Sequence, residues 1–323
     1  MTKPKVFITR RIPDAGLNLI YEECEVDLWD QDLPPSKEEL LQHVPGVDGI
    51  LSLLSDPIDA EVIKAAGENL RVISNYAVGY NNIDIQEATR RNISVGNTPG
   101  VLTEATADFA FALMMSAGRR VVEAEKHVRA GKWKTWGPST LLGVDFAGAT
   151  LGIIGFGRIG KAMARRATGF GMRILIYDPT AQAMAGIIKV DLDTLYRESD
   201  FISIHTLLTP ETKYLINAGA FARMKPNAVL VNTARGEIVD QEALYDALKN
   251  HRIFAAGIDV SDPEPLPMDS PLLELDNLII CPHIASASTS SRENMALIAA
   301  GNLLAGLRGE RLPFSVNPEI YNQ

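Results

Sequence analysis

The sequence predicts an α/β protein with two domains, each built around a doubly wound parallel sheet. Three observations lead to this prediction: a length of 323 residues, short apolar runs that alternate with helical patterns, and a second such series that begins near Pro99. At roughly 100–200 residues per domain, this length corresponds to two domains. Strands that alternate with helices favour a parallel sheet covered on both faces. An apolar fraction of 46% is sufficient for two cores.

The first series consists of short apolar segments typical of buried strands, separated by segments with apolar residues at helical spacing. The expected strands are Val6–Thr9, Gly49–Leu53, Leu70–Ser74 and Ile93–Gly96. The expected helices are Ala15–Glu23, Lys37–His43, Asp59–Ala66 and Ile85–Arg90.

The second series opens with a long helix, Thr103–Arg120, and a closing helix, Ser291–Arg308, follows its last strand. The expected strands are Thr150–Ile154, Arg173–Tyr177, Phe201–Ile204, Ala228–Asn232, Ala255–Asp259 and Leu278–Cys281, with a helix at Gly160–Gly169. Because the closing helix follows a complete unit, we expect it to return to the first domain. The expected domains are therefore residues 1–98 with 289–323, and residues 99–288, so that the first is discontinuous.

Charge and cysteine content argue against several classes of function. The chain has 31 Lys and Arg against 40 Asp and Glu, whereas a general nucleic-acid binder needs a basic surface. Cys24 and Cys281 lie far apart, and their spacing predicts neither a disulfide framework nor a metal site. The first residues lack the apolar run of a signal peptide, and the apolar stretches elsewhere are too short to cross a bilayer. We expect a cytoplasmic protein that binds neither nucleic acid nor membrane.

A glycine-rich turn follows the strand at Thr150–Ile154 and opens a helix. Its pattern is Gly155-x-Gly157-x-x-Gly160. The first glycine permits a tight turn, the second lets a pyrophosphate approach the backbone, and the third allows close packing of helix and strand. The N–H groups at the helix N-terminus then favour the negative charge of the pyrophosphate. A turn that only packs the helix on the strand is the structural alternative.

Asp178 ends the next expected strand, 18 residues beyond Gly160. A carboxylate at this position accepts hydrogen bonds from ribose hydroxyls and repels a 2′-phosphate. No Arg follows directly, since the next residues are Pro179, Thr180 and Ala181. The sequence therefore favours NAD over NADP.

Three polar segments each follow an expected strand, which places them at the carboxyl edge where open α/β sheets bind ligands. They are Asn232–Gly236, Asp259–Pro265 and Cys281–Ser286. With these segments and the glycine turn, the chain resembles the NAD(P)-dependent D-isomer-specific 2-hydroxyacid dehydrogenases, and most of all the glyoxylate/hydroxypyruvate reductases. Two further segments, Tyr76–Asp84 and Asn97–Asp108, carry the signal of this subfamily. The resemblance extends over nearly the whole chain and implies two Rossmann-like domains.

The resemblance implies a catalytic set of Arg235, Glu264 and His283. Reduction of a 2-keto acid needs a proton donor for the forming alkoxide and a cation for the carbonyl and carboxylate. His283 would donate the proton, Glu264 would hold its imidazole, and Arg235 would bind and polarise the substrate. Taken alone, His283 is more typical of a histidine satisfied within a core, Glu264 of a turn and Arg235 of an ion pair.

The same resemblance implies the binding residues. For a small anionic 2-keto or 2-hydroxy acid they are Leu54, Val78, Gly79, Arg235 and His283. For the cofactor they are Thr106, Gly155, Phe156, Gly157, Arg158, Ile159, Gly160, Asp178, Pro179, Thr180, His205, Thr206, Thr233, Ala234, Asp259 and Ala285. We expect His205 to pack near the cofactor rather than to transfer a proton.

The helix Thr103–Arg120 and the following segment with Trp133 and Trp136 resemble the dimerisation arm of the family, which implies a homodimer. The apolar residues Phe109, Leu113 and Val121 could instead belong to the core of one chain. The two tryptophans could simply anchor a loop.

Other functions remain open on the sequence. They are D-3-phosphoglycerate dehydrogenase, a broad D-2-hydroxyacid dehydrogenase, and an NAD-sensing corepressor-like module that is not an enzyme. The chain also departs from its subfamily. Several NADPH-dependent relatives carry an Arg beside the position of Asp178, and the animal enzymes carry an additional Trp where this chain has Thr140. Substrate size and cofactor preference therefore do not transfer directly from the resemblance.

Overall fold

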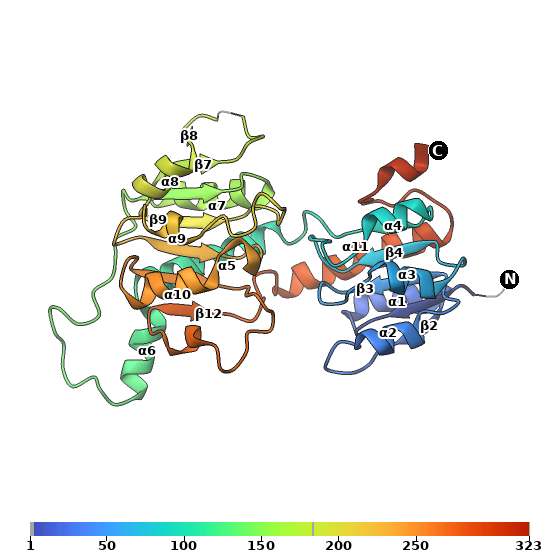
Figure 1. The fold of residues 1–323 in the computed structure, drawn as a ribbon. Helices are drawn as coiled ribbons and strands as arrows, with labels where there is room; N and C mark the ends of the chain where they lie inside the picture. Colours follow the sequence, from blue (N-terminus) through green and yellow to red (C-terminus); the bar gives the residue numbers. More distant parts are fainter. Residues whose placement is uncertain (1–2, 183, 323) are drawn as a thin grey trace. The chain divides into compact units, whose positions relative to one another are not determined.

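The computed structural model describes residues 3–182 and 184–322, and these form two compact units. Unit 1 comprises Met1–Leu102 with Ala287–Gln323, and unit 2 comprises Thr103–Ser286. Each unit contains one parallel sheet, so the predicted α/β class is confirmed (Figure 1).

Unit 1 is built on a five-stranded sheet in the order β2-β1-β3-β4-β5. Its strands are β1 (Lys5–Ile8), β2 (Glu25–Leu28), β3 (Gly49–Ser52), β4 (Val72–Asn75) and β5 (Ser94–Gly96). Its helices are α1 (Asp14–Glu23), α2 (Lys37–His43), α3 (Ala60–Ala66), α4 (Ile85–Arg90), α11 (Thr289–Leu307) and the 3₁₀ turn η3 (Pro318–Asn322).

Helices cover both faces of this sheet. One core contains Leu40 of α2, Ile63 of α3 and Ala88 of α4, packed on strand residues such as Phe7 and Ile73. On the other face α11 packs against α1, β3 and β4. Because α11 packs in unit 1, this unit consists of two separate segments of the chain.

Unit 2 is built on a seven-stranded parallel sheet in the order β12-β11-β10-β9-β6-β7-β8. Its strands are β6 (Thr150–Ile154), β7 (Arg173–Tyr177), β8 (Ile187–Lys189), β9 (Phe201–Ile204), β10 (Val229–Asn232), β11 (Ala255–Ile258) and β12 (Leu278–Ile280). Its helices are α5 (Thr103–Gly118), α6 (Val121–Arg129), α7 (Arg158–Gly169), α8 (Leu192–Glu198), α9 (Ala218–Phe221), α10 (Gln241–Lys249), and the 3₁₀ turns η1 (Gly236–Ile238) and η2 (Pro271–Glu274).

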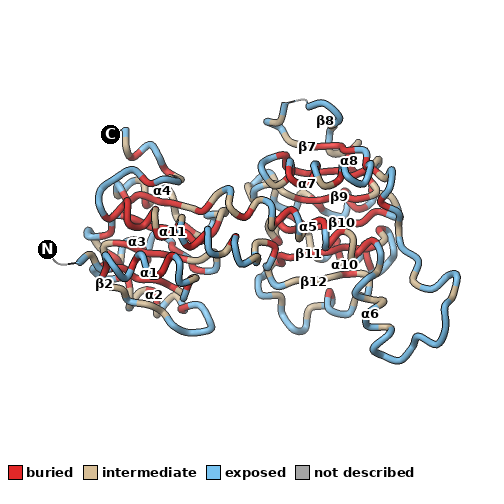
Figure 2. The backbone as a smooth tube through the Cα atoms, turned by 180° about the vertical axis from the view of Figure 1, so that it is seen from behind, coloured by how far each residue is buried: buried red, intermediate tan, exposed pale blue. Residues whose placement is uncertain are grey.

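The strand order of unit 2 reverses at β6, because β6 pairs with β9 on one side and with β7 on the other. The crevice above such a reversal is where doubly wound sheets bind ligands. One face of the sheet is covered by α5 and α7, and the other by α8, α9 and α10. The strands form the buried centre of each unit, and the connecting loops are mostly exposed (Figure 2).

The expected elements did not include strands β2 and β8, nor helices α6, α8, α9 and α10. Strand β2 was not expected, because its residues Glu-Val-Asp-Leu lie on a sheet edge and are only half-buried in alternation. Helix α5 ends at Gly118, and a separate helix α6 follows Arg120, which has a left-handed φ of 53°. Such a backbone angle interrupts a helix, so the expected helix Thr103–Arg120 corresponds to α5, and α6 beyond it was not expected.

Candidate active site

The glycine turn after β6 requires glycine at two of its three positions. Gly155 has a φ of +89°, and a Cβ there would lie 2.6 Å from the backbone of His205 and Thr206. A Cβ at Gly160 would lie 2.2 Å from the carbonyl oxygen of Gly155. The turn is therefore compressed between the start of α7 and the end of β9, next to the reversal in strand order.

Gly157 has a different environment. A Cβ built on it meets no atom within 4 Å, so the space in front of α7 is open. Gly157 is the N-cap of the 12-residue helix α7, whose first turn has no acidic residue and whose N-cap makes no side-chain hydrogen bond. Unpaired N–H groups at a helix N-terminus favour an anion. This part of the turn fits a pyrophosphate.

Asp178 stands at the end of β7, beside the glycine turn. Its Oδ2 accepts a hydrogen bond from the backbone N–H of Phe156 at 2.7 Å. Its Oδ1 accepts from Thr180 N and Oγ1, both at 2.8 Å, and from Ala181 N at 3.0 Å. Burial opposes ionisation, but these donors outweigh it and hold the pKa of Asp178 below its usual range. The carboxylate is therefore charged at neutral pH.

Lys189 of β8 holds the same segment from the other side. Its Nζ donates to the carbonyl oxygens of Pro179 at 3.1 Å and of Ala181 at 2.9 Å. Lys189 was not predicted, since nothing in the sequence marks which lysine of an edge strand faces a neighbouring loop.

The imidazole of His205 follows β9 and is surrounded by protein, although part of the residue is exposed. Its Nε2 lies 2.8 Å from Ser203 Oγ. Burial lowers the pKa of His205 to about 4, so the ring is neutral at physiological pH.

The loop after β10 presents Arg235. Asn232 folds this loop back, because its Nδ2 donates to the carbonyl of Arg235 at 2.8 Å and its Oδ1 accepts from Ala234 N at 3.0 Å. A Cβ at Gly236 would lie 2.1 Å from the backbone of Ser261, so only glycine lets this loop reach the segment after β11. Burial lowers the pKa of Arg235, while Glu237 and Glu264 favour its charged form.

His283 and Glu264 are joined by a hydrogen bond of 2.6 Å between Nδ1 and Oε1. They come from the loops after β12 and β11, which are neighbouring strands, and β10 with Arg235 lies next in the sheet. Burial raises the pKa of Glu264, but the hydrogen bond and the charge of His283 outweigh it and leave that pKa below its usual range. The structure thus brings the three predicted catalytic residues to one sheet edge.

Asp259 organises the loop that carries His283. The backbone N–H of His283 donates to the carbonyl oxygen of Asp259 at 2.9 Å. The two carboxylate oxygens of Asp259 accept from Ile284 N at 2.8 Å and from Ala285 N at 2.7 Å. Burial raises the pKa of Asp259 despite these donors.

Thr106 and Thr233 are buried, and Thr233 Oγ1 is fully buried without a hydrogen-bond partner among the described residues. A buried hydroxyl without a partner is uncommon and fits a site where a ligand supplies the missing bond. Of the remaining predicted cofactor residues, Arg158 and Ile159 lie in the first turn of α7, and Thr206 and Ala234 lie in the loops that follow β9 and β10.

The other predicted substrate residues belong to unit 1, also in loops that follow strands. Leu54 follows β3, and Val78 and Gly79 follow β4. All three are half-buried.

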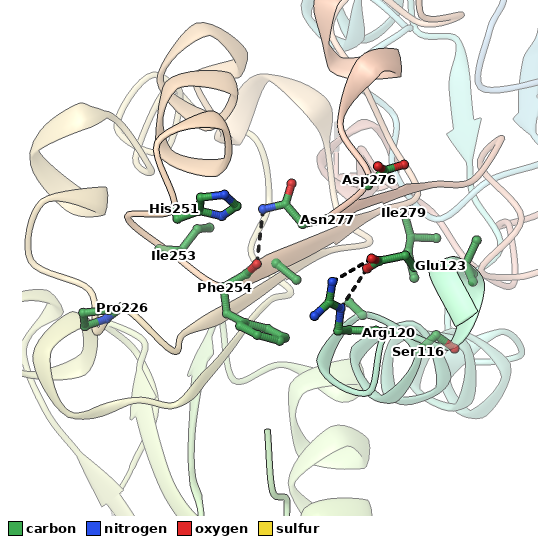
Figure 3. A pocket seen from close by; sticks show the side chains of 13 residues that line it. Ser116, Arg120, Glu123, Pro226, His251, Ile253, Phe254, Asp276, Asn277 and Ile279 are labelled. Atoms are coloured by element: carbon green, nitrogen blue, oxygen red, sulfur yellow. Dashed lines mark hydrogen bonds and ion pairs between the residues drawn. The ribbon is translucent and has the colours of Figure 1, made fainter. Parts of the chain in front are cut away.

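A separate pocket of about 150 Å³ lies at the amino-terminal ends of the unit 2 strands, beside the starts of β11 and β12. Figure 3 shows Arg120 and Glu123 on one side and His251 and Asn277 on the other. None of the predicted site residues lines it. It borders α6 and so belongs to a different surface from the glycine turn.

Among the described residues, no helix combines the length and apolar character needed to span a membrane. Within the same residues, no group of His, Cys, Asp and Glu side chains is arranged to hold a metal ion.

Comparison with known proteins identifies the family. A model described as "D-isomer specific 2-hydroxyacid dehydrogenase, NAD binding domain" matches residues 111–285. The glyoxylate reductase of Korarchaeum cryptofilum is 55% identical over 323 residues, which cover 98% of this chain and 97% of that protein.

Solved structures agree. A protein from Thermus thermophilus superposes with a TM-score of 0.92 at 46% identity, covering 97% of this chain and 99% of that one. The NADPH-dependent glyoxylate/hydroxypyruvate reductase of Sinorhizobium meliloti, solved with NADP and malonate, superposes with a TM-score of 0.87 at 30% identity, covering 98% of both chains. The resemblance stated from the sequence is confirmed. The chain belongs to the D-isomer specific 2-hydroxyacid dehydrogenases, enzymes that use a nicotinamide cofactor to interconvert small 2-keto and 2-hydroxy acids.

Proposed function

We propose that this enzyme reduces glyoxylate, hydroxypyruvate or both to the D-2-hydroxy acid with NADH, with His283 as the proton donor. The observation that carries the proposal is the 2.6 Å hydrogen bond between His283 Nδ1 and Glu264 Oε1, on the sheet edge that also holds Arg235 and the glycine turn. The names of relatives such as the Korarchaeum cryptofilum protein support these substrates.

The His283–Glu264 pair suits proton transfer to the keto oxygen. A carboxylate only accepts hydrogen bonds, so Nδ1 carries a proton and Nε2 is the atom left to face the substrate. The negative charge of Glu264 stabilises the imidazolium, which is the form that donates a proton during reduction. In the reverse direction, the neutral Nε2 accepts the proton of the hydroxyl group.

Arg235 is the proposed cation for the substrate. Its guanidinium offers a planar set of donors to the carboxylate and the keto oxygen. Its interaction with the keto oxygen strengthens as that oxygen gains negative charge, so it lowers the barrier more than it strengthens ground-state binding. Asn232 and Gly236 set the path of the loop that presents it.

The residues around the glycine turn are proposed to hold the cofactor, which supplies the hydride when bound. The α7 N-terminus behind Gly157 would bind the pyrophosphate, and Asp178 the adenosine ribose. Thr233 and Ala234 are proposed to lie beside the nicotinamide half. Unit 2 is thus the proposed cofactor domain, and unit 1 the proposed substrate domain, where Leu54 and the N–H groups of Val78 and Gly79 would receive the keto acid.

The preference for NADH rests on Asp178. An ionised carboxylate next to the ribose repels the 2′-phosphate of NADPH. We expect Asp178→Ala to reduce the ratio of kcat/KM for NADH over NADPH by about tenfold or more. Asp191→Ala is the matched control. Asp191 is also a carboxylate of unit 2 that binds backbone N–H groups: it is the N-cap of α8 and accepts a hydrogen bond from Thr194 N at 2.7 Å. A wild-type enzyme that prefers NADPH would contradict this assignment and leave the reaction standing.

The reaction itself is tested by following NADH oxidation with glyoxylate, hydroxypyruvate, pyruvate and phosphohydroxypyruvate in parallel. Glyoxylate or hydroxypyruvate should give the highest kcat/KM. A clear preference for phosphohydroxypyruvate would replace the proposal with a phosphoglycerate dehydrogenase. Binding of NADH without turnover of any keto acid would reject the enzyme assignment in favour of an NAD-sensing module.

A homodimer is also proposed. No residue of α6 is buried, and it exposes Val121, Val122 and Val128. The segment that follows exposes Trp133, Trp136 and Leu142, at 64%, 80% and 62%. Large apolar side chains gathered on one surface favour an interface. We call α6 and residues 130–142 the arm, and a second copy of this chain is its proposed partner.

A further inference from the structure

The loop after β4 is held by its carbonyl groups. Thr98 N donates to the carbonyl oxygen of Ala77 at 2.9 Å. Asn97 Nδ2 donates to that of Val78 at 2.8 Å, and Asn75 Nδ2 to that of Gly79 at 2.8 Å. Three consecutive carbonyl groups of one loop are therefore each bound from within unit 1.

Because the peptide bond is planar, the contacts that hold these carbonyl groups also fix the directions of the neighbouring N–H groups. In a planar trans peptide, the carbonyl of one residue and the N–H of the next point in opposite directions. Fixing the carbonyl of Ala77 thus directs the N–H of Val78, and fixing the carbonyl of Val78 directs the N–H of Gly79. Neither N–H group donates a hydrogen bond to any of the described residues. Both point away from the groups that hold the loop.

We propose that Asn97 is a positioning residue, whose side-chain amide orients the N–H group of Gly79 toward the carboxylate of the keto acid, and that Asn75 supports it by holding the next peptide of the same loop. This inference rests on the proposed function, which assigns that N–H group to the substrate. Asn97 acts on the N–H of Gly79 through the peptide plane that this group shares with the carbonyl of Val78. Asn75 fixes the next peptide, because it binds the carbonyl oxygen of Gly79.

Both residues are themselves held in place, Asn75 by its side chain and Asn97 by its backbone. Asn75 is fully buried, and its Oδ1 accepts from Ser52 Oγ at 3.1 Å. Its Nδ2 also lies 3.1 Å from Asn82 Oδ1. The backbone of Asn97 is bound on both sides, since its N–H donates to Phe314 O at 3.2 Å and its carbonyl accepts from Asn302 Nδ2 at 2.9 Å. An amide held this way keeps the loop in one orientation before substrate binds, which lowers the entropy cost of binding.

The test is the affinity of Asn97→Ala for oxalate, a small dicarboxylate that cannot be reduced, measured by calorimetric titration of the NADH-saturated enzyme. We expect the Kd for oxalate and the KM for glyoxylate to rise about tenfold or more, which is the size of one lost hydrogen bond to a charged group. The kcat at saturating glyoxylate and the Kd for NADH should change less than about threefold. Asn97→Asp keeps the shape but replaces the donor by an acceptor, and should weaken oxalate binding at least as much.

Asn317→Ala is the matched control. Asn317 is fully buried in the same unit and makes comparable hydrogen bonds, donating to Ile93 O at 2.9 Å and accepting from Val95 N at 2.8 Å. It contacts β5 and not the loop, so it should lower the Tm without changing the Kd for oxalate. If Asn97→Ala and Asn97→Asp both bind oxalate within about twofold of the wild type, the inference is wrong.

Two variants at Gly79 separate this inference from the proposal beneath it. Gly79→Pro removes the N–H group, and Gly79→Ala retains it. If Gly79→Pro binds oxalate as well as Gly79→Ala does, the loop does not hold the carboxylate, and the proposed function is wrong in that respect. If Gly79→Pro weakens binding but the Asn97 variants do not, only the positioning role is rejected.

Discussion

His283 has a φ of +55°, which is unusual for a residue with a side chain. Strained backbone of this kind persists only where the surroundings over-determine it, and it is frequent at functional sites. Here Asp259 provides the constraint, because it accepts hydrogen bonds from three consecutive N–H groups, those of residues 283 to 285. The rigid loop holds the imidazole against Glu264.

Glu264→Gln tests the electrostatic part of this arrangement. The pKa of Glu264 lies below its usual range, so the carboxylate is ionised throughout the neutral range and stabilises the imidazolium. The amide keeps a hydrogen bond but has no charge. We expect kcat for reduction to fall about tenfold to a hundredfold, and the alkaline limb of its pH profile to move to lower pH. Glu274→Gln, in the η2 turn, is the control, and an unchanged pH profile in Glu264→Gln would contradict the role.

The same residue gives a prediction for stability. A carboxylate whose pKa is depressed by folding stabilises the protein above its unfolded pKa, and this contribution is lost as the pH falls through the folded pKa. The Tm of Glu264→Gln should therefore lie below that of the wild type at pH 7, and the difference should shrink in acid. Thermal melts at pH 7 and pH 4 would show it, and a difference that grows in acid would contradict the sign.

Much of the site could be predicted at the level of residues, and the omissions have a common cause. The glycine turn and the strand-end polar segments were recognisable because their spacing reflects backbone requirements. The roles of Asn232, Lys189 and Asn75 were missed because each donates to a backbone carbonyl three to ten residues away, and no pattern of side chains marks such a contact. The roles of the catalytic and binding residues stay predictions until they are measured.

At the scale of elements, the close contact between α1 and α11 depends on one glycine. A Cβ on Gly16 of α1 would lie 2.3 Å from the carbonyl oxygen of Ala296 in α11. The two helices pack closely here because no side chain separates them. Gly301, also in α11, has no atom within 4 Å of the position of its missing Cβ.

These two glycines predict opposite effects of the same substitution. Gly16→Ala should destabilise the protein by about 1–3 kcal/mol, because the helices must move apart. Gly301→Ala should stabilise it by about 0.4–1 kcal/mol, because alanine restricts the unfolded chain without a clash. Chemical denaturation of both variants measures this directly. Equal changes in the free energy of unfolding would mean that α1 and α11 are not in close contact at Gly16.

The element pattern also shows where prediction from sequence ends. Central strands such as β3 and β10 were found because their residues are mostly apolar and all buried. Strand β2 was missed because an edge strand buries only part of its surface. Helix α6 was missed: the expected helix ended at Arg120, which is the N-cap of α6, and no residue of α6 is buried.

At the scale of the whole molecule, the proposed dimer predicts a particle of twice the chain mass of 35.2 kDa in sedimentation equilibrium. The arm exposes large apolar side chains, which an interface with a second copy would cover. Val128→Asp places a charge on the exposed face of α6 and should shift the protein toward monomer. Ile188→Asp, on the opposite end of the unit 2 sheet, should not. A wild-type monomer would refute the assignment of the arm.

The central claim is that this enzyme makes a D-2-hydroxy acid at His283. The most direct test is to incubate it with hydroxypyruvate and NADH and to determine, by chiral chromatography, the glycerate formed per NADH consumed. We predict one equivalent of D-glycerate, with the rate reduced about a hundredfold or more in His283→Ala. Formation of L-glycerate, or an undiminished rate in His283→Ala, would contradict the account.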